Sequence, residues 1–190
     1  MSLRKSLIRM TVDEYLESEK TSPIRSEYLD GEIYAMSGAS RRHNRITMNL
    51  CTHLASRLRD GPREVFVTEV KVRIEPLNYF YYPDLVVTCD PEDKDDYFVT
   101  RPILVVEVES PSTAAIDRRE KLMAYRKLES LKEYLMLSQD SLRADVFRRD
   151  NNGDWSREQL EGDQELRLES VDLNLRLPDL YEGVELRSES

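Results

Sequence analysis

Two short stretches decide the fold of this 190-residue chain: Tyr82-Pro83-Asp84-Leu85-Val86-Val87 and Ile103-Leu104-Val105-Val106-Glu107-Val108-Glu109. Both are apolar runs of strand length, and each contains a carboxylate where a buried strand usually has an apolar side chain. Burial of an unpaired charge costs several kcal/mol, so these acids need a cation or another partner. The sequence therefore predicts two central strands whose carboxylates bind a cation or a partner group.

The segments around these strands have recognisable helix and strand patterns. Thr11 and Glu14 have the spacing of a capping box and predict a short helix over about 12–19. Apolar residues recur every four positions over 43–59, which is typical of an amphipathic helix. A third helix is expected over about 114–129, and strands are expected over 80–88, 102–109 and 133–138.

Turn signals divide the rest of the chain. Asp30-Gly31 lies between strand-like runs and predicts a hairpin over 27–36, because Gly accepts the positive φ of a type I′ turn. The alternation of apolar residues over 64–75 changes phase near Thr68-Glu69, which predicts two strands or a bulge. The acid-rich segment 89–101 is expected to be a solvated, mobile loop. Short strands are expected over 142–147, 155–160, 165–168 and 171–177.

The order of these elements predicts an α/β (α+β) domain. It has a mixed β-sheet flanked by helices, an N-terminal β-hairpin and a C-terminal β-meander. The length suits a single domain over 1–190, with a core at about 10–150 and C-terminal strands over 151–186.

The composition describes a water-soluble protein and limits its partners. Charged residues make up 34% of the chain, and no apolar run approaches the roughly 20 residues that span a bilayer. Cys51 and Cys89 are too few for a disulfide framework, and no signal peptide is recognisable, so we expect a cytoplasmic protein without a membrane segment. The net charge of -9 argues against an ordinary DNA-binding domain. Any contact with nucleic acid must be local, assisted by a metal ion, or made with a partner's help.

The carboxylates of the two central strands are the candidate metal ligands. Asp84 follows Pro83 at the start of an apolar run, and Glu107 and Glu109 point to the same face of their strand. Val108 points the other way, into the core. If the strands are neighbours, Asp84 and Glu107 meet at one end of the sheet, where their oxygens suit Mg²⁺ or Mn²⁺.

The helix after the second strand adds a cation. Asp117, Lys121 and Tyr125 fall within one arc of this helix at about 100° per residue. A Lys beside metal-bound carboxylates can position a water molecule and offset negative charge in a transition state.

Each of these signals also has an ordinary structural explanation. A strand-end carboxylate such as Asp84 is usually a surface group, and acids alternating with valines are typical of a strand with one wet face. Asp117 and Lys121 form an i, i+4 pair of a common kind, worth only about 0.2–0.5 kcal/mol. The joint order favours a site: Pro-Asp on one strand, Glu-x-Glu on the next, and Lys on the following helix.

This order resembles the PD-(D/E)XK nuclease superfamily, and more closely the Uma-two family of bacterial proteins grouped with the restriction endonucleases. The resemblance covers most of the chain between about 10 and 150. The matching segments are Tyr28-Leu29-Asp30-Gly31-Glu32-Ile33, Met36-Ser37-Gly38 with His43, Pro83-Asp84-Leu85-Val86-Val87, Val106-Glu107-Val108-Glu109-Ser110-Pro111-Ser112-Thr113, Asp117 with Glu120-Lys121, and Tyr125 through Glu133-Tyr134.

The resemblance implies a restriction-endonuclease-like fold and roles for the matching positions. Asp84 and Glu107 correspond to the metal-binding acids, and Mg²⁺ or Mn²⁺ is the implied cofactor. The lysine of the motif should stand at 109, where this chain has Glu109. Lys121 on the helix is assigned the lysine role instead. Glu109 is then either a further metal ligand or a source of acidity that permits metal binding without turnover.

Accessory candidates are weaker. Glu32 follows the Asp-Gly turn and is either an additional ligand from the edge or a solvated hairpin residue. His43 opens a helix, where a hydrogen-bonding role is more common than a catalytic one. Trp155 and the tyrosines at 79, 81 and 82 are interpreted as packing groups rather than as platforms for bases.

The sequence thus supports two hypotheses about function. The first is a metal-dependent endonuclease that hydrolyses nucleic-acid phosphodiester bonds, DNA rather than RNA, with Asp84, Glu107 and Lys121 as catalytic residues. The alternative is a catalytically inactive nuclease-fold protein that acts as a binding or scaffold module. The resemblance also implies a homodimer. Arginines would separate the two hypotheses if they surround the carboxylates in space; the candidates are Arg41, Arg42, Arg45, Arg118 and Arg119.

Overall fold

The computed structural model describes residues 9–109 and 117–186. The helices are α1 (Val12–Thr21), α2 (Arg41–Leu58), α3 (Asp117–Tyr125) and the 3₁₀ turns η1 (Glu75–Leu77), η2 (Glu169–Val171) and η3 (Leu177–Tyr181). The strands are β1 (Ser26–Leu29), β2 (Glu32–Ala35), β3 (Glu64–Val67), β4 (Lys71–Ile74), β5 (Tyr79–Tyr81), β6 (Leu85–Thr88), β7 (Phe98–Val99), β8 (Pro102–Glu109), β9 (Glu133–Ser138), β10 (Arg143–Arg149), β11 (Trp155–Glu161), β12 (Glu165–Leu168) and β13 (Leu173–Arg176).

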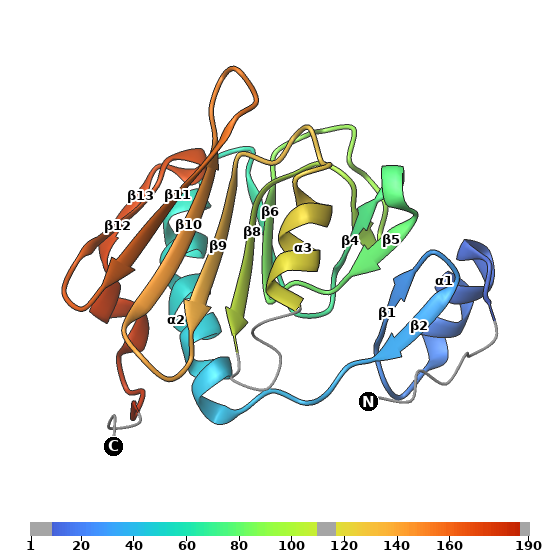
Figure 1. The fold of residues 1–190 in the computed structure, drawn as a ribbon, viewed down its shortest axis with the longest axis horizontal. Coiled ribbons are helices and arrows are strands. Elements are labelled where there is room, and N and C mark those ends of the chain that lie inside the picture. The colour runs from blue at the N-terminus through green and yellow to red at the C-terminus, as the bar shows by residue number, and fades with distance from the viewer. Residues whose placement is uncertain (1–8, 110–116, 187–190) are drawn as a thin grey trace.

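A six-stranded sheet in the order β11-β10-β9-β8-β6-β3 forms the centre of the molecule (Figure 1). β8 and β9 are parallel and the other neighbouring strands are antiparallel, so the sheet is mixed as predicted. Helix α2 packs on one face and α3 on the other. The predicted α+β class is therefore confirmed.

A second sheet contains the predicted hairpin. Its order is β2-β1-β5-β4-β7, and the aromatic side chains of Tyr28 and Phe80 pack in it against Tyr15 of α1. Asp30 and Gly31 form the hairpin turn with φ values of 48° and 97°, the positive values that a type I′ turn requires. A third sheet pairs β12 with β13.

Helix α3 lies between the two larger sheets. Its buried residues Ala124 and Tyr125 belong to a hydrophobic cluster that includes Val105 of β8 and Val72 of β4, which come from different sheets. The site-bearing helix is therefore fixed from two sides, and its position relative to both sheets is set by packing.

The chain crosses between the sheets at two adjacent points. The segment 80–88, which we expected to be one strand, is divided between β5 and β6 in different sheets. Pro83 lies at the break, where its missing N–H prevents it from continuing a ladder of hydrogen bonds. The other crossing joins β3 to β4, and the Thr68 N–H of that crossing donates to the Asp84 carbonyl oxygen at 3.1 Å. The predicted phase change near Thr68 thus marks a change of sheet.

Two further expectations need correction. The segment 89–101 is anchored: Asp93 accepts hydrogen bonds from the backbone N–H groups of Thr100 and Arg101, and buried Phe98 and Val99 form β7. The helix expected over 114–129 ends at Tyr125, after which the chain continues in tight turns. The first residues of that expected helix, 114–116, lie outside the described residues.

Helix α2 has the features predicted for it. The Ser40 side chain caps its N-terminus by accepting from the His43 N–H at 3.1 Å. Ile46, Leu50 and Leu54 form the stripe that is buried against the six-stranded sheet. His43 consequently lies on the side of the helix that faces the sheet.

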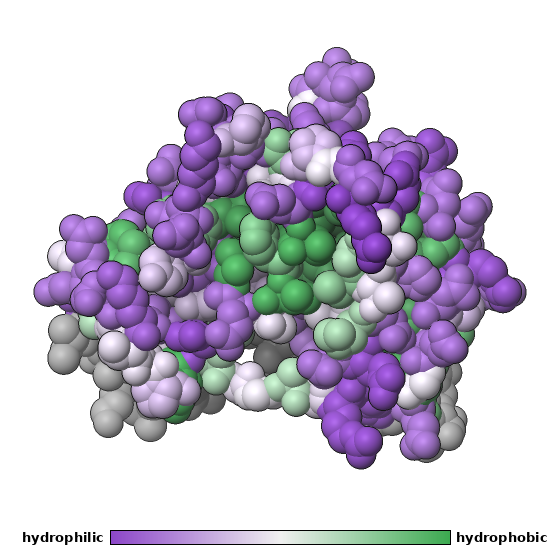
Figure 2. Space-filling view, turned by 180° about the vertical axis from the view of Figure 1, so that it is seen from behind, coloured by the Kyte–Doolittle hydropathy of each residue, from purple (hydrophilic) through white to green (hydrophobic). Residues whose placement is uncertain are grey.

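One face of the molecule combines a hydrophobic centre with a hydrophilic surround. Figure 2 shows hydrophobic residues gathered near the centre of the face opposite to that of Figure 1, surrounded by hydrophilic ones. Among the described residues, no helix is long and apolar enough to cross a membrane.

Glu133 connects the C-terminal part of the chain to the six-stranded sheet. Only 2% of this side chain is exposed. Its carboxylate accepts from Arg148 Nε at 3.1 Å and from the N–H and hydroxyl of Ser170 at 2.8 and 2.5 Å. A buried carboxylate with this many charge-assisted partners fixes the position of η2 on the sheet.

We expect Glu133→Ala to lower the free energy of unfolding by about 3 kcal/mol, because it leaves Arg148 and the η2 donors without their acceptor. The measurement is urea denaturation followed by circular dichroism. The matched control is Glu129→Ala, which removes an exposed carboxylate and should change stability by less than about 0.5 kcal/mol. Equal effects of the two substitutions would contradict this account.

Candidate active site

Asp84 is placed at the junction of the two larger sheets. It follows Pro83 immediately before β6, and its Oδ2 accepts a hydrogen bond from the Val108 N–H at 2.6 Å. Because Val108 is adjacent to Glu107 on β8, this bond brings the two predicted acids to the same end of neighbouring strands. The predicted meeting of Asp84 and Glu107 is thus a direct consequence of the pairing between β6 and β8.

Glu107 projects from the face of β8 that carries α3. Its neighbours Val106 and Val108 face the α2 side, as expected from the alternation of side chains along a strand. Glu107 Oε1 accepts from Lys121 Nζ at 3.1 Å and from the Tyr125 hydroxyl at 3.2 Å. Lys121 and Tyr125 are one helical turn apart, so both reach the same carboxylate.

Lys121 is held by a second carboxylate that the sequence did not single out. Its Nζ lies 2.8 Å from Glu27 Oε1, and it also lies 5.3 Å from the ring centroid of Tyr81. Glu27 is on β1 of the five-stranded sheet, and only 17% of the side chains of Glu27 and Lys121 is exposed. The ammonium group is therefore enclosed by acids from both sheets.

His43 reaches the site from α2. Its Nε2 lies 3.1 Å from Asp84 Oδ2, the oxygen that also accepts from Val108. Burial alone would lower the pKa of His43, but the hydrogen bond to Asp84 and the charges of Asp84 and Glu107 outweigh it and raise the pKa. The acids beside His43 thus favour its protonated form more than in an ordinary histidine.

Burial and neighbouring charges shift the pKa values of Glu107 and Lys121. Burial, together with the nearby charges of Asp84 and Glu27, raises the pKa of Glu107 to about 7, although Lys121 opposes this shift. Burial would lower the pKa of Lys121, but the charges of Glu107 and Glu27 dominate and raise it. Lys121 therefore stays protonated at neutral pH and acts as a cation, while Glu107 can change protonation near pH 7.

The remaining predicted candidates have different outcomes. Glu109 is half-buried on the same face of β8 as Glu107. The Asp117 side chain lies outside the described part of the structure. Glu32 is exposed at the start of β2, where it accepts from the Tyr34 hydroxyl at 2.5 Å. The hairpin thus contributes Glu27 to the site, and Glu32 is the solvated hairpin residue.

The sequence contains part of the information needed to predict a role for Glu27. It is a carboxylate within a strand-length run, the same feature that marked Asp84 and Glu107. The distance between β1 and α3 in the sequence hid the contact, because nothing in the local pattern shows that the hairpin approaches that helix.

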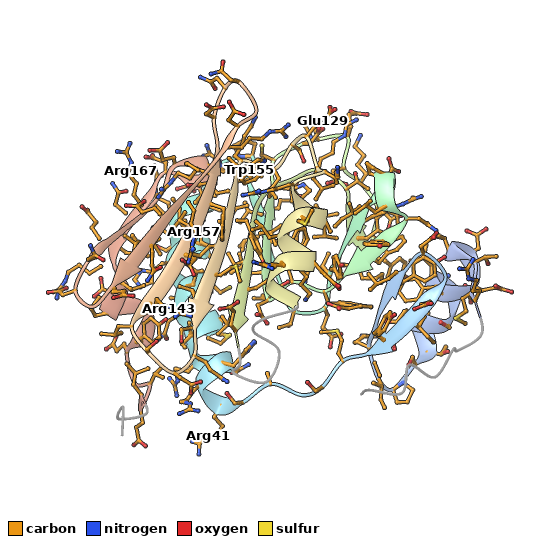
Figure 3. All side chains as sticks on the ribbon, in the orientation of Figure 1. Arg41, Glu129, Arg143, Trp155, Arg157 and Arg167 are labelled. Atoms are coloured by element: carbon orange, nitrogen blue, oxygen red, sulfur yellow. The ribbon has the colours of Figure 1, made fainter. Side chains whose placement is uncertain are left out.

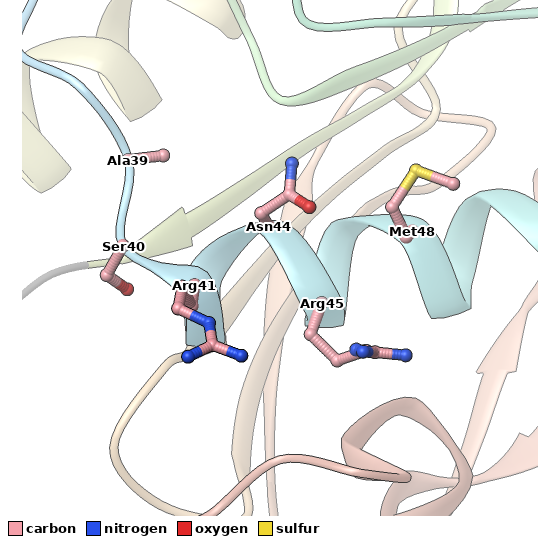
Figure 4. Close-up of a pocket in the computed structure, with 6 residues that line it drawn as sticks. All are labelled: Ala39, Ser40, Arg41, Asn44, Arg45 and Met48. Atoms are coloured by element: carbon pink, nitrogen blue, oxygen red, sulfur yellow. The ribbon is translucent and has the colours of Figure 1, made fainter.

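The arginines predicted on α2 are paired elsewhere or point away from the carboxylates, Arg119 is exposed on α3, and the side chain of Arg118 lies outside the described residues. Arg42 forms an ion pair with Asp140 at 2.8 Å. Arg41 and Arg45 are two residues on either side of His43, about 200° around the helix, so they point to the opposite side of α2. With Ala39, Ser40, Asn44 and Met48 they line a groove of about 450 Å³ (Figure 4).

Trp155 lies near the opposite end of the six-stranded sheet from Arg41 (Figure 3). It packs against Arg126, whose guanidinium carbon is 5.4 Å from the ring centroid. Tyr81 and Tyr82 are buried. Tyr79 and Trp155 are half-buried and pack against the same hydrophobic cluster. All four side chains therefore pack within the protein, which agrees with their interpretation as packing groups.

Asp84 and Glu107 fit a small divalent cation. Oδ2 of Asp84 and Oε1 of Glu107 accept the hydrogen bonds described above, and carboxylate oxygens are the hard ligands that Mg²⁺ and Mn²⁺ prefer. Mg²⁺ typically binds one or two protein carboxylates and keeps several waters. No group of three or more His, Cys, Asp or Glu side chains that could hold a metal ion is present in residues 9–109 and 117–186.

A solved structure has the same fold. The crystal structure described as that of "a putative nuclease belonging to DUF820" from Anabaena variabilis matches 93% of this chain and 99% of its own with a TM-score of 0.74, at 17% sequence identity. The fold is therefore nuclease-like.

The sequence comparisons identify the family. A profile of the Uma2 family, described as "Putative restriction endonuclease", matches residues 12–178. Two proteins of Synechocystis sp. (strain PCC 6803) are similar: "Uncharacterized protein slr1290" is 36% identical over 93% of both chains, and "Uncharacterized protein sll1609" is 33% identical over 81% of this chain and 89% of its own. The chain belongs to the Uma2 family, as the resemblance of its motifs predicted.

The raised pKa of Glu107 leads to a prediction about stability. The ordinary pKa of a glutamate is 4.5, and that of Glu107 in the folded protein is about 7, so between these pH values the folded protein binds more protons than the unfolded chain. Stability must then fall as the pH rises through this window. Without added metal, we expect the unfolding free energy of the wild type, relative to that of Glu107→Gln, to fall by about 1–3 kcal/mol between pH 5 and pH 7.5.

Denaturant titrations in the presence of a chelator measure this difference. Glu129→Gln, which alters an exposed carboxylate, serves as the control and should follow the wild type at every pH. A difference between the wild type and Glu107→Gln that does not change with pH would show that Glu107 titrates normally.

Proposed function

We propose that this protein is a metal-dependent endonuclease that hydrolyses phosphodiester bonds, with DNA as the favoured substrate. The observation that supports it best is the approach of Lys121 Nζ to within 3.1 Å of Glu107 Oε1, at the end of β8 where Asp84 binds the adjacent backbone. Two acids that can bind a metal ion and a lysine that stays protonated lie at one end of a sheet, and phosphodiester hydrolysis uses groups of these kinds. The family and the nuclease-like fold support the same class of reaction.

Asp84 and Glu107 would hold the metal ion. A bound Mg²⁺ or Mn²⁺ would polarise the phosphate and lower the pKa of a water molecule. The polypeptide itself supplies the arrangement: the Val108 N–H fixes Asp84, and the Tyr125 hydroxyl fixes Glu107. Oriented ligands of this kind bind a cation without first reorganising.

Lys121 is proposed to bind the phosphate rather than to transfer a proton. Its pKa is raised by Glu107 and Glu27 against the effect of burial, so it cannot act as a base at neutral pH. The ammonium has three N–H donors, and the two carboxylates do not use all of them. The remaining donor can stabilise negative charge that develops on the phosphate oxygens.

The alternative function is that of a binding protein without turnover. The net charge of -9, Glu109 at the motif lysine position, and the orientation of Arg41 and Arg45 away from the acids favour it. The enclosed Lys121 favours the enzyme, because binding alone does not require a buried cation between two acids. A cleavage assay separates the two functions.

We expect the wild type to cleave supercoiled or single-stranded DNA in the presence of Mg²⁺ or Mn²⁺. Asp84→Asn and Lys121→Met should each lower the rate at least about 100-fold, because each removes a charge that acts on the transition state. Lys127→Met is the matched control, since it removes an exposed lysine just beyond the same helix and should leave the rate unchanged.

Gel analysis of nicked and linear products measures the rate. Absence of cleavage by the wild type, together with absence of Asp84-dependent metal binding in calorimetry, would contradict the endonuclease. Metal binding without cleavage of either DNA would favour the binding protein.

We further propose a cytoplasmic homodimer. Both cysteines, Cys51 and Cys89, are free thiols, as expected in a reducing compartment. β3 is an edge strand of the six-stranded sheet with half-buried Val65, Phe66 and Val67, and such edges are commonly covered by a second copy. Light scattering coupled to size-exclusion chromatography should give the mass of a dimer. A monomer mass across micromolar concentrations would rule the dimer out.

A further inference from the structure

Lys121 forms its shorter ion pair with Glu27, not with Glu107. The distance from Nζ is 2.8 Å to Glu27 Oε1 and 3.1 Å to Glu107 Oε1. The three side chains come from three different elements: α3, β1 of the five-stranded sheet and β8 of the six-stranded sheet. Nothing in the sequence motifs assigns a role to Glu27.

This ion pair differs from a surface salt bridge. Exposed pairs are screened by water and contribute about 0–1 kcal/mol. Here 17% of each of the Glu27 and Lys121 side chains is exposed, and the Tyr81 ring lies 5.3 Å from the ammonium nitrogen. Electrostatic interactions are stronger in such surroundings than in water, so the positions of the two carboxylates determine where the ammonium lies.

Glu107 has more than one role, whereas Glu27 has one. Glu107 Oε1 already accepts from Lys121 and Tyr125, and the same carboxylate is a proposed metal ligand. A divalent cation bound at Glu107 would compete with Lys121 for the negative charge and would repel the ammonium. Glu27, on another sheet, can retain the ammonium while Glu107 binds the metal.

We propose that Glu27 is the positioning residue for Lys121, holding the ammonium beside the metal-binding carboxylates from the opposite sheet. This inference rests on the proposed endonuclease function. It means that the β1–β2 hairpin is part of the active site, although it supplies no ligand to the metal. The motif has a lysine on the strand, at the position of Glu109. In this chain Lys121 on α3 would replace it, and Glu27 of the hairpin would set the position of Lys121.

A simpler role for Glu27 is to dock the hairpin on α3. The two roles differ in how Glu27 depends on Lys121. A positioning residue acts through the lysine, so its loss has no further effect once Lys121 is gone. A docking residue affects the protein whether or not Lys121 contributes to the reaction.

The first experiment does not require cleavage. Acetic anhydride acetylates lysines, and mass spectrometry of peptides gives the rate at Lys121 relative to exposed Lys127. In metal-free protein, we expect Glu27→Gln to raise the relative rate at Lys121 at least fivefold, because the ammonium loses its closer anion. Glu165→Gln, which alters an exposed strand acid on β12, should leave it unchanged. An unchanged rate in Glu27→Gln overturns the proposal, whether or not the protein is a nuclease.

The second experiment tests the consequence for catalysis. Glu27→Gln should lower kcat for DNA cleavage about 10–100-fold and change KM less than about threefold. Glu27→Asp should recover part of the rate, and adding Glu27→Gln to Lys121→Met should cost nothing further. If Glu27→Gln lowers kcat by the same factor in the wild type and in Lys121→Met, Glu27 acts independently of Lys121. If no variant cleaves DNA, the endonuclease proposal fails, and the acetylation rates still test whether Glu27 holds the ammonium of Lys121.

Discussion

A protonated lysine enclosed by protein requires anions at hydrogen-bond distance, and this requirement governs the centre of the molecule. Lys121 meets it with Glu107 from one sheet and Glu27 from another. Removing a charged partner from such a cluster leaves an uncompensated charge, which costs several kcal/mol. The two sheets and α3 are therefore joined by electrostatics as well as by the apolar cluster around Tyr125. Because Lys121 of α3 pairs with acids on both β1 and β8, a movement of any one of these elements would break an ion pair.

Asp84 shows how the path of the chain builds the rest of the site. The polypeptide crosses from one sheet to the other at Pro83, and Asp84 is the first residue after the crossing. Its backbone carbonyl accepts from Thr68 at the neighbouring crossing, while its side chain accepts from Val108. The acid thus both fixes the junction and faces the candidate metal site. His43 lies at hydrogen-bond distance from the same carboxylate, and the charges of Asp84 and Glu107 raise its pKa against the effect of burial.

Local regularities explain what the sequence could predict. Alternation along β8 and the helical spacing of Lys121 and Tyr125 place these side chains correctly, because both periods are properties of the backbone. The contact between Glu27 and Lys121 depends on packing of α3 between two sheets, which no local pattern records. The single strand expected over 80–88 failed for a related reason: apolar runs on either side of Pro83 belong to different sheets. Arg41 and Arg45 cluster in sequence, but the helix turns them away from the acids.

We propose that Asp84 and Glu107 form a metal site beside the ammonium of Lys121, which Glu27 holds in place. X-ray diffraction at the manganese absorption edge, from crystals grown with Mn²⁺, tests it most directly. We expect an anomalous peak between the carboxylates of Asp84 and Glu107, with Lys121 still paired to Glu27. Manganese bound elsewhere, or not bound at all to the protein in these crystals, would contradict it.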